Sequence, residues 1–185
     1  MSNELYISVD VETAGPFPSQ YALLSIGACL VSNTDINFYT ELQPDRPDFL
    51  PESLKISGLQ MQSLQQTGQP PLTAMTAFAE WVRTVTPRGD RPVFVALNAP
   101  FDWMFINDYF YRYIGSNPFG HSALDIKAFY MGYSGVEWSQ TSFRHINRFL
   151  NHETCLAHNA LKDAQDQAAI FLAILNQSRS FPRSS

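Results

Sequence analysis

The run Val93-Phe94-Val95-Ala96-Leu97 is the sequence feature that most limits how this chain can fold. Five consecutive apolar residues leave no polar side for water, and two of them are β-branched valines. The segment 91–97 therefore predicts a short strand that is buried on both faces. A strand of that kind lies inside a sheet and not at its edge.

Other segments predict the remaining elements. Residues 5–11, 23–32 and 36–42 are rich in β-branched and aromatic residues and are separated by turn-forming residues, which predicts a meander of three strands. Apolar residues recur at helical spacing in 72–85, where two prolines precede the helix and a third ends it. Further helices are predicted at 51–58, 102–114, 126–131, 142–150 and 159–176.

Chain length and net charge limit the number of domains and the kinds of nucleic acid that the protein could bind. The chain has 185 residues, enough for one domain, which we place at residues 1–177 with a flexible tail at 178–185. Seventeen acidic and 12 basic residues give a formal net charge of −5. Tight binding of long duplexes usually rests on many lysine and arginine contacts. If nucleic acid is the substrate, short or single-stranded ends are favoured.

Cellular context is predicted from cysteines and hydropathy. Cys29 and Cys155 are far apart in sequence, and free thiols in a reducing compartment are the simplest interpretation. The N-terminus lacks the pattern of a leader, and no window approaches 18 consecutive apolar residues. We therefore expect a soluble cytoplasmic protein without a membrane partner.

Asp10 and Glu12 lie at the end of the first predicted strand. Residues two apart in a strand point to the same face, so both carboxylates are aimed at one point. Like charges side by side repel unless a cation lies between them, which indicates a hard ion such as Mg²⁺ or Mn²⁺. The alternative is a solvent-facing strand end with one carboxylate capping the next turn.

Two later segments bring further polar groups. Asp102 follows the buried strand, and by itself it fits the N-cap of the helix that begins there. His158 lies at or just before the start of the last helix, and Asp163 follows about one and a half turns later. An imidazole there can accept a proton while the carboxylate holds a metal. Asp163 could instead be an exposed helix residue, and Asp166 is an alternative candidate for the metal-binding carboxylate of this helix.

The three motifs together resemble those of a known family. Asp-x-Glu at 10–12, Asn-Ala-x-Phe-Asp at 98–102 and His-x-Ala-x-x-Asp at 158–163 are individually weak but jointly specific. In this order they are similar to the DnaQ-like 3′–5′ exonucleases, in the DEDDh branch. The resemblance implies an α/β, ribonuclease H-like fold, with a five-stranded mixed sheet flanked by helices and the first strand central.

The resemblance also implies roles. Asp10, Glu12, Asp102 and Asp163 would hold two divalent ions, Mg²⁺ or Mn²⁺, and His158 would be the general base in phosphodiester hydrolysis that releases nucleoside 5′-monophosphates. Substrate contacts would come from Thr13, Ala14, Phe17 and Phe101. Thr13 and Ala14 would use backbone groups. Phe17 would stack a base, whereas for Phe101 core packing is the stronger alternative.

The partners implied by the resemblance are the 3′ ends of single-stranded or short DNA or RNA, and a homodimer is left open. Two other functions compete with the exonuclease. A non-catalytic module on the same fold would bind nucleic acid or protein, and an endonuclease of the wider ribonuclease H-like group would cut internally. The catalytic positions argue against the first, and the His-x-Ala-x-x-Asp ending argues against the second.

Overall fold

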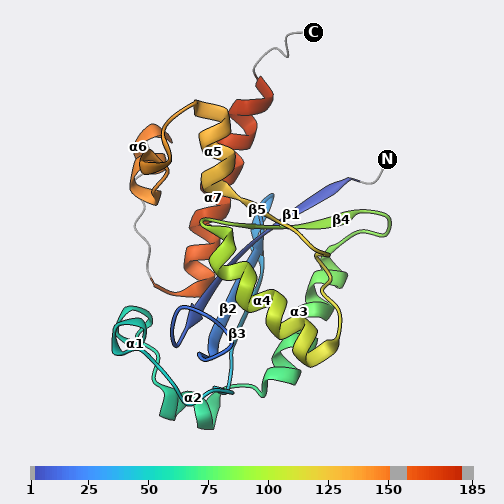
Figure 1. The fold of residues 1–185 in the computed structure, drawn as a ribbon. Coiled ribbons are helices and arrows are strands. Elements are labelled where there is room, and N and C mark those ends of the chain that lie inside the picture. Colours follow the sequence, from blue (N-terminus) through green and yellow to red (C-terminus); the bar gives the residue numbers. More distant parts are fainter. Residues whose placement is uncertain (1–2, 151–157, 181–185) are drawn as a thin grey trace.

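A five-stranded sheet in the order β3-β2-β1-β4-β5 forms the centre of the molecule (Figure 1). The structure is a computed structural model that describes residues 3–150 and 158–180. β1 pairs antiparallel with β2 and parallel with β4, so the sheet is mixed and its first strand is central, as predicted. The strands are β1 (Glu4–Thr13), β2 (Leu23–Leu30), β3 (Asn33–Glu41), β4 (Arg91–Ala96) and β5 (Ala123–Asp125).

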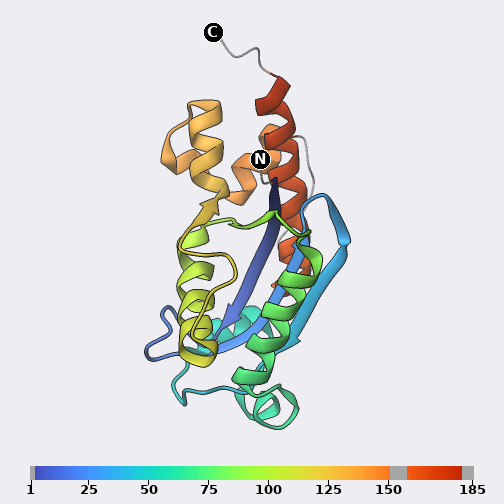
Figure 2. The ribbon, with the colours of Figure 1, turned by 90° about the vertical axis from the view of Figure 1, so that its right-hand side faces the viewer.

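Helices cover both faces of this sheet (Figures 1 and 2). α3 and α4 pack on one face around Phe78 and Phe110, and α5, α6 and α7 pack on the other around Phe171. The helices are α1 (Pro51–Ser57), α2 (Met61–Thr67), α3 (Pro71–Val85), α4 (Ala99–Ile114), α5 (Ile126–Ser134), the 3₁₀ helix η1 (Trp138–Gln140), α6 (Phe143–Leu150) and α7 (Ala160–Ser180). Within the described ranges, no helix combines the length and apolarity that a membrane span requires.

The two faces of β1 differ in character. Ile7, Val9 and Val11 point to the α3–α4 face and belong to the larger core cluster. The alternate residues Ser8, Asp10 and Glu12 point to the other face, where α7 packs on β1 and β2. A polar face in the middle of a sheet and beneath a helix is costly for stability, which is a reason to seek a ligand there.

Several elements differ from the sequence prediction. α2 and β5 were not predicted, because α2 buries only Leu64 and β5 has only three residues, too few for a periodic pattern. α7 extends through Ser180, so the first residues assigned to the tail are helical. Cys29 is a buried free thiol whose pKa is raised to about 12 by burial, and Cys155 lies outside the described residues.

Candidate metal centre

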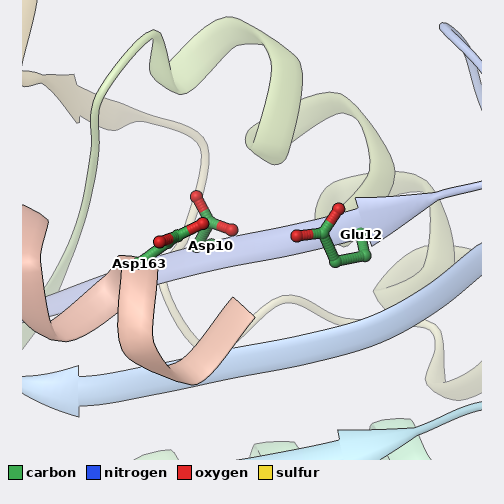
Figure 3. A group of neighbouring side chains, drawn as sticks. All are labelled: Asp10, Glu12 and Asp163. Atoms are coloured by element: carbon green, nitrogen blue, oxygen red, sulfur yellow. The ribbon is translucent and has the colours of Figure 1, made fainter. Parts of the chain in front are cut away.

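Asp10 and Glu12 lie on the same side of β1, next to the first turns of α7 (Figure 3). Asp163 reaches them from α7, and its carboxylate adjoins that of Asp10 (Figure 3). Each of the three residues offers a carboxylate oxygen within 4.8 Å of the others. Three oxygens at that separation fit a hard divalent cation, which prefers oxygen ligands.

The close seating of α7 on the sheet explains how Asp163 reaches β1. Gly27 of β2 is the register partner of Asp10. A Cβ atom at Gly27 would lie 2.1 Å from the carbonyl carbon of Ala160 and 2.2 Å from the amide nitrogen of Leu161. The start of α7 therefore rests on a glycine that has no room for a side chain. Ala164, one turn further along α7, is also fully buried.

The acidic side chains strongly perturb one another. Burial raises the pKa of Asp10 well above its usual range, and the charges of Asp102, Glu12 and Asp163 add to the effect. Burial, together with the charge of Asp163, raises the pKa of Glu12 to about 7. Perturbed carboxylates of this kind cluster at functional sites. A bound cation would reverse the shifts by favouring the ionised forms.

Asp102 lies in the first turn of α4 and is only 4% exposed. Its Oδ1 atom accepts a hydrogen bond from the amide of Val11, between the two acidic residues of β1, at 3.2 Å. Burial raises its pKa to about 8. The alternative role as N-cap is wrong, because α4 begins at Ala99 and Asn98 occupies the cap position with a left-handed backbone.

Gln167 is a buried member of the site that sequence reasoning missed. Its Nε2 atom donates to Oδ1 of Asp10 at 2.5 Å, and its Oε1 atom accepts from the amide of Leu97 at 2.8 Å. One amide thus links α7, β1 and the end of β4. Gln167 lies four residues after Asp163, and so on the same face of α7. This spacing is the only signal in the sequence that could have identified it.

Asp163 and Asp166 have different surroundings, although both are buried. Asp163 contributes to the carboxylate cluster, so the alternative of an exposed helix residue is wrong. Asp166 is absent from that cluster, and its Oδ1 atom accepts from Nζ of Lys162 at 2.6 Å. The structure therefore favours Asp163 over its rival as a metal ligand.

His158 is exposed and precedes α7, with a left-handed backbone at φ 53°. The next residue, Asn159, caps the helix, because its Oδ1 atom accepts from the amide of Lys162 at 3.1 Å. His158 therefore lies just before the helix, as predicted, on the residue where the chain turns into α7. A non-glycine residue with a left-handed backbone is uncommon and is found more often at functional sites.

The four residues predicted to contact substrate differ in their exposure and in the hydrogen bonds that they already form. Phe17 is 40% exposed and packs edge-on against Tyr21. Phe101 is partly buried against the larger core cluster. Thr13 is buried, and its hydroxyl donates to the carbonyl of Gly15. Ala14 is fully buried, and its amide already donates to a backbone carbonyl, so that N–H group is not free for a substrate hydroxyl.

Comparisons with known proteins identify the family of the chain. Residues 7–171 match the RNase_T family, which is described as an exonuclease. The 3′–5′ DNA exonuclease Cap18 of Escherichia coli is 44% identical over 171 residues, which cover 92% of this chain and 91% of that protein. The chain belongs to the DnaQ-like 3′–5′ exonuclease family. The predictions of a nuclease and of exonuclease function are thereby confirmed.

Solved structures of other exonucleases share the fold. The nuclease domain of 3′hExo, a DEDDh family member bound to rAMP, superposes with a TM-score of 0.78 at 15% identity, covering 94% of this chain and 92% of that one. E. coli Exonuclease I in complex with a dT13 oligonucleotide gives a TM-score of 0.69 at 19% identity, covering 97% of this chain and 42% of that one. These likenesses confirm the ribonuclease H-like fold. The family and the acidic cluster together indicate that this exonuclease depends on divalent metal.

Proposed function

We propose that this exonuclease removes nucleotides one at a time from the 3′ end of single-stranded DNA and releases nucleoside 5′-monophosphates. The convergence of Asp10, Glu12 and Asp163 is the observation that carries the proposal. Three carboxylates so close together, and partly or fully buried, repel one another without a cation. The 44% identical relative, named as a DNA exonuclease, supports DNA over RNA.

The four acidic residues would hold two divalent ions, Mg²⁺ or Mn²⁺, which favour attack by water at phosphorus and stabilise the departing 3′ oxygen. Asp10, Glu12 and Asp163 supply ligands from two elements, and Asp102 lies beside them through its bond to the amide of Val11. The oxygen-only donor set of the three clustered carboxylates fits both ions.

His158 is proposed as the general base that accepts a proton from the attacking water. His158 is exposed and directly precedes the residue that caps α7, so its imidazole is accessible to solvent. Phe17, exposed in the loop after β1, is proposed to stack on the terminal base, because aromatic faces bind bases without reading sequence. Phe101 and the backbone of Thr13 complete the proposed contacts. The cytoplasmic location and the homodimer stay predictions.

End-labelled oligonucleotides test the proposal. Single-stranded DNA and RNA of one sequence are labelled at either end and incubated with protein in Mg²⁺, in Mn²⁺ or with a chelator. We expect early release of the 3′ label as mononucleotide, faster from DNA and only with metal. The 5′ label should pass through a ladder of shortening products. Internal cuts, release from the 5′ end or hydrolysis in the chelator would contradict the proposal.

A further inference from the structure

The segment from α5 to α6 is basic in an acidic protein. Residues 126–150 contain three basic residues and one acidic residue, a formal charge of +2 in a chain whose total is −5. The basic residues are Lys127, Arg144 and Arg148, and both arginines are exposed. The segment can therefore attract a phosphodiester strand electrostatically, although the chain as a whole is acidic.

Trp138 lies within this segment with its side chain unburied. It is 51% exposed, whereas Trp81 and Trp103 are partly buried against the larger core cluster. The ammonium of Lys127 lies 4.3 Å from the centroid of the indole. An exposed indole held against a cation contributes little to a hydrophobic core. It is, however, well suited to stack on a nucleobase next to a phosphate.

The backbone that carries Trp138 is firmly held. Glu137 and Gln140 form reciprocal capping bonds around η1. The buried Thr141 donates from its hydroxyl to the carbonyl of Trp138 at 2.7 Å. The indole is therefore presented from a fixed turn, which lowers the entropy lost when a ligand stacks on it.

A short chain of contacts joins this segment to the metal centre. The amide of Lys127 donates to Oδ1 of Asp125 at 3.1 Å. The same oxygen accepts from the amides of Asn98 and Ala99, at 2.9 and 3.3 Å, where α4 begins. Asp102 follows in the first turn of α4. α5 thus starts next to the start of α4, which carries Asp102 (Figure 1).

We propose that Trp138, Lys127, Arg144 and Arg148 form a second binding surface for the single strand, outside the metal centre. The indole stacks on a base several nucleotides from the 3′ end, and the cations contact the phosphates beside it. The proposal rests on the exonuclease function above. It adds a binding site for the nucleotides that precede the 3′ end. A terminal dinucleotide is too short to reach this surface, whereas a longer strand gains affinity from it.

The test compares two substrates in one variant. Trp138→Ala should lower the ratio of kcat/KM for a strand of about 12 nucleotides to that for a dinucleotide by about 10-fold. Tyr111→Ala is the matched control, since Tyr111 is an aromatic residue with 44% exposure on α4 and lies about 13 Å along the helix from Asp102. This control should keep the wild-type ratio. An unchanged ratio in Trp138→Ala, or an equal loss on both substrates, overturns the second surface.

Binding without hydrolysis separates this proposal from the function on which it rests. Fluorescence anisotropy of a labelled strand in a chelator measures affinity when no cleavage occurs. In the double variant Arg144→Gln, Arg148→Gln two phosphate contacts are lost. The slope of log affinity against log salt concentration should therefore become less steep by about 1.4. A wild-type slope overturns the surface. Absence of hydrolysis by the wild-type protein on either substrate overturns the exonuclease, whatever the anisotropy shows.

Discussion

Gly27→Ala tests whether the close packing of α7 on the sheet sets the position of Asp163, the proposed metal ligand. The new Cβ atom would lie 2.1 Å from the carbonyl carbon of Ala160, and ordinary contact begins at 3.4 Å. The start of α7 must therefore move by about 1.3 Å, since backbone atoms on both sides cannot rotate away. Asp163 lies within the same turn as Ala160 and moves with it.

The expected cost falls on both activity and stability. A misplacement of about 1 Å at a catalytic group lowers turnover about 100-fold. Overpacking costs about 1–3 kcal/mol, which in a chain of this size lowers Tm by roughly 2–12 °C. Turnover of a 3′-labelled oligonucleotide and a thermal melt measure the two effects. The displaced ligand should also raise the metal concentration that gives half-maximal activity.

Gly132→Ala is the matched control for this substitution. Gly132 lies inside α5, and a Cβ atom there meets nothing within 4 Å. Alanine is about 1 kcal/mol more favourable than glycine in a helix, so Tm should stay the same or rise slightly with unchanged turnover. If Gly27→Ala keeps wild-type turnover and metal dependence, the seating of α7 does not position Asp163 and the reasoning fails.

Four further outcomes are expected. Asp163→Ala should abolish metal-dependent hydrolysis, whereas Asp166→Ala should keep most of it; similar activity of the two variants would contradict the ligand assignment. His158→Ala should cut single-turnover rates by about 10²- to 10⁴-fold while anisotropy shows nearly intact oligonucleotide binding. Gln167→Glu keeps the size of the side chain but cannot donate to Asp10, so activity should fall about 10- to 100-fold, with a higher metal requirement in a titration. The raised carboxylate pKa values mean that the metal-free protein loses stability as pH rises from about 4 through about 8, because the ionised forms are favoured only after unfolding. Metal binds the ionised forms, so the increase in Tm on adding Mg²⁺ or Mn²⁺ should be larger at about pH 8 than at about pH 6, and equal increases would contradict the linkage.

Local patterns were enough to predict the parts of the site that depend on short spacings. The period of a strand places Asp10 and Glu12 on one side, and the turn of a helix separates His158 from Asp163. Gln167 and Gly27 were missed because their roles depend on partners distant in sequence. The amide of Gln167 contacts residues 157 and 70 positions away, and the space at Gly27 is closed by α7. The four-residue spacing from Asp163 indicates the face of α7 on which Gln167 lies, but it does not identify these distant partners.

The same distinction applies to whole elements. β4 was predicted because a fully apolar run is best buried inside a sheet. The start of α3 was predicted from Pro70 and Pro71, which are the N-cap and the first residue of that helix. α2 buries one side chain, and β5 is a three-residue strand that pairs with β4, so their sequences carry little pattern of their own. Both depend on neighbours already in place. The helix that contains Asp102 was predicted, but it begins at Ala99 and not at Asp102, because Asn98 occupies the N-cap position two residues after the end of β4.

α7 shows why the fold and the proposed chemistry cannot be varied independently. Ala160, Ala164 and Ala168 recur every four residues and are fully buried, so one stripe of the helix lies close to the sheet. Asp163 and Gln167 follow the same spacing, and both reach Asp10 or its neighbours on β1. A larger side chain on the alanine stripe would lift both groups together. The small residues are therefore required by the site as much as by the core, and changes that leave the overall fold intact can still disable the metal centre.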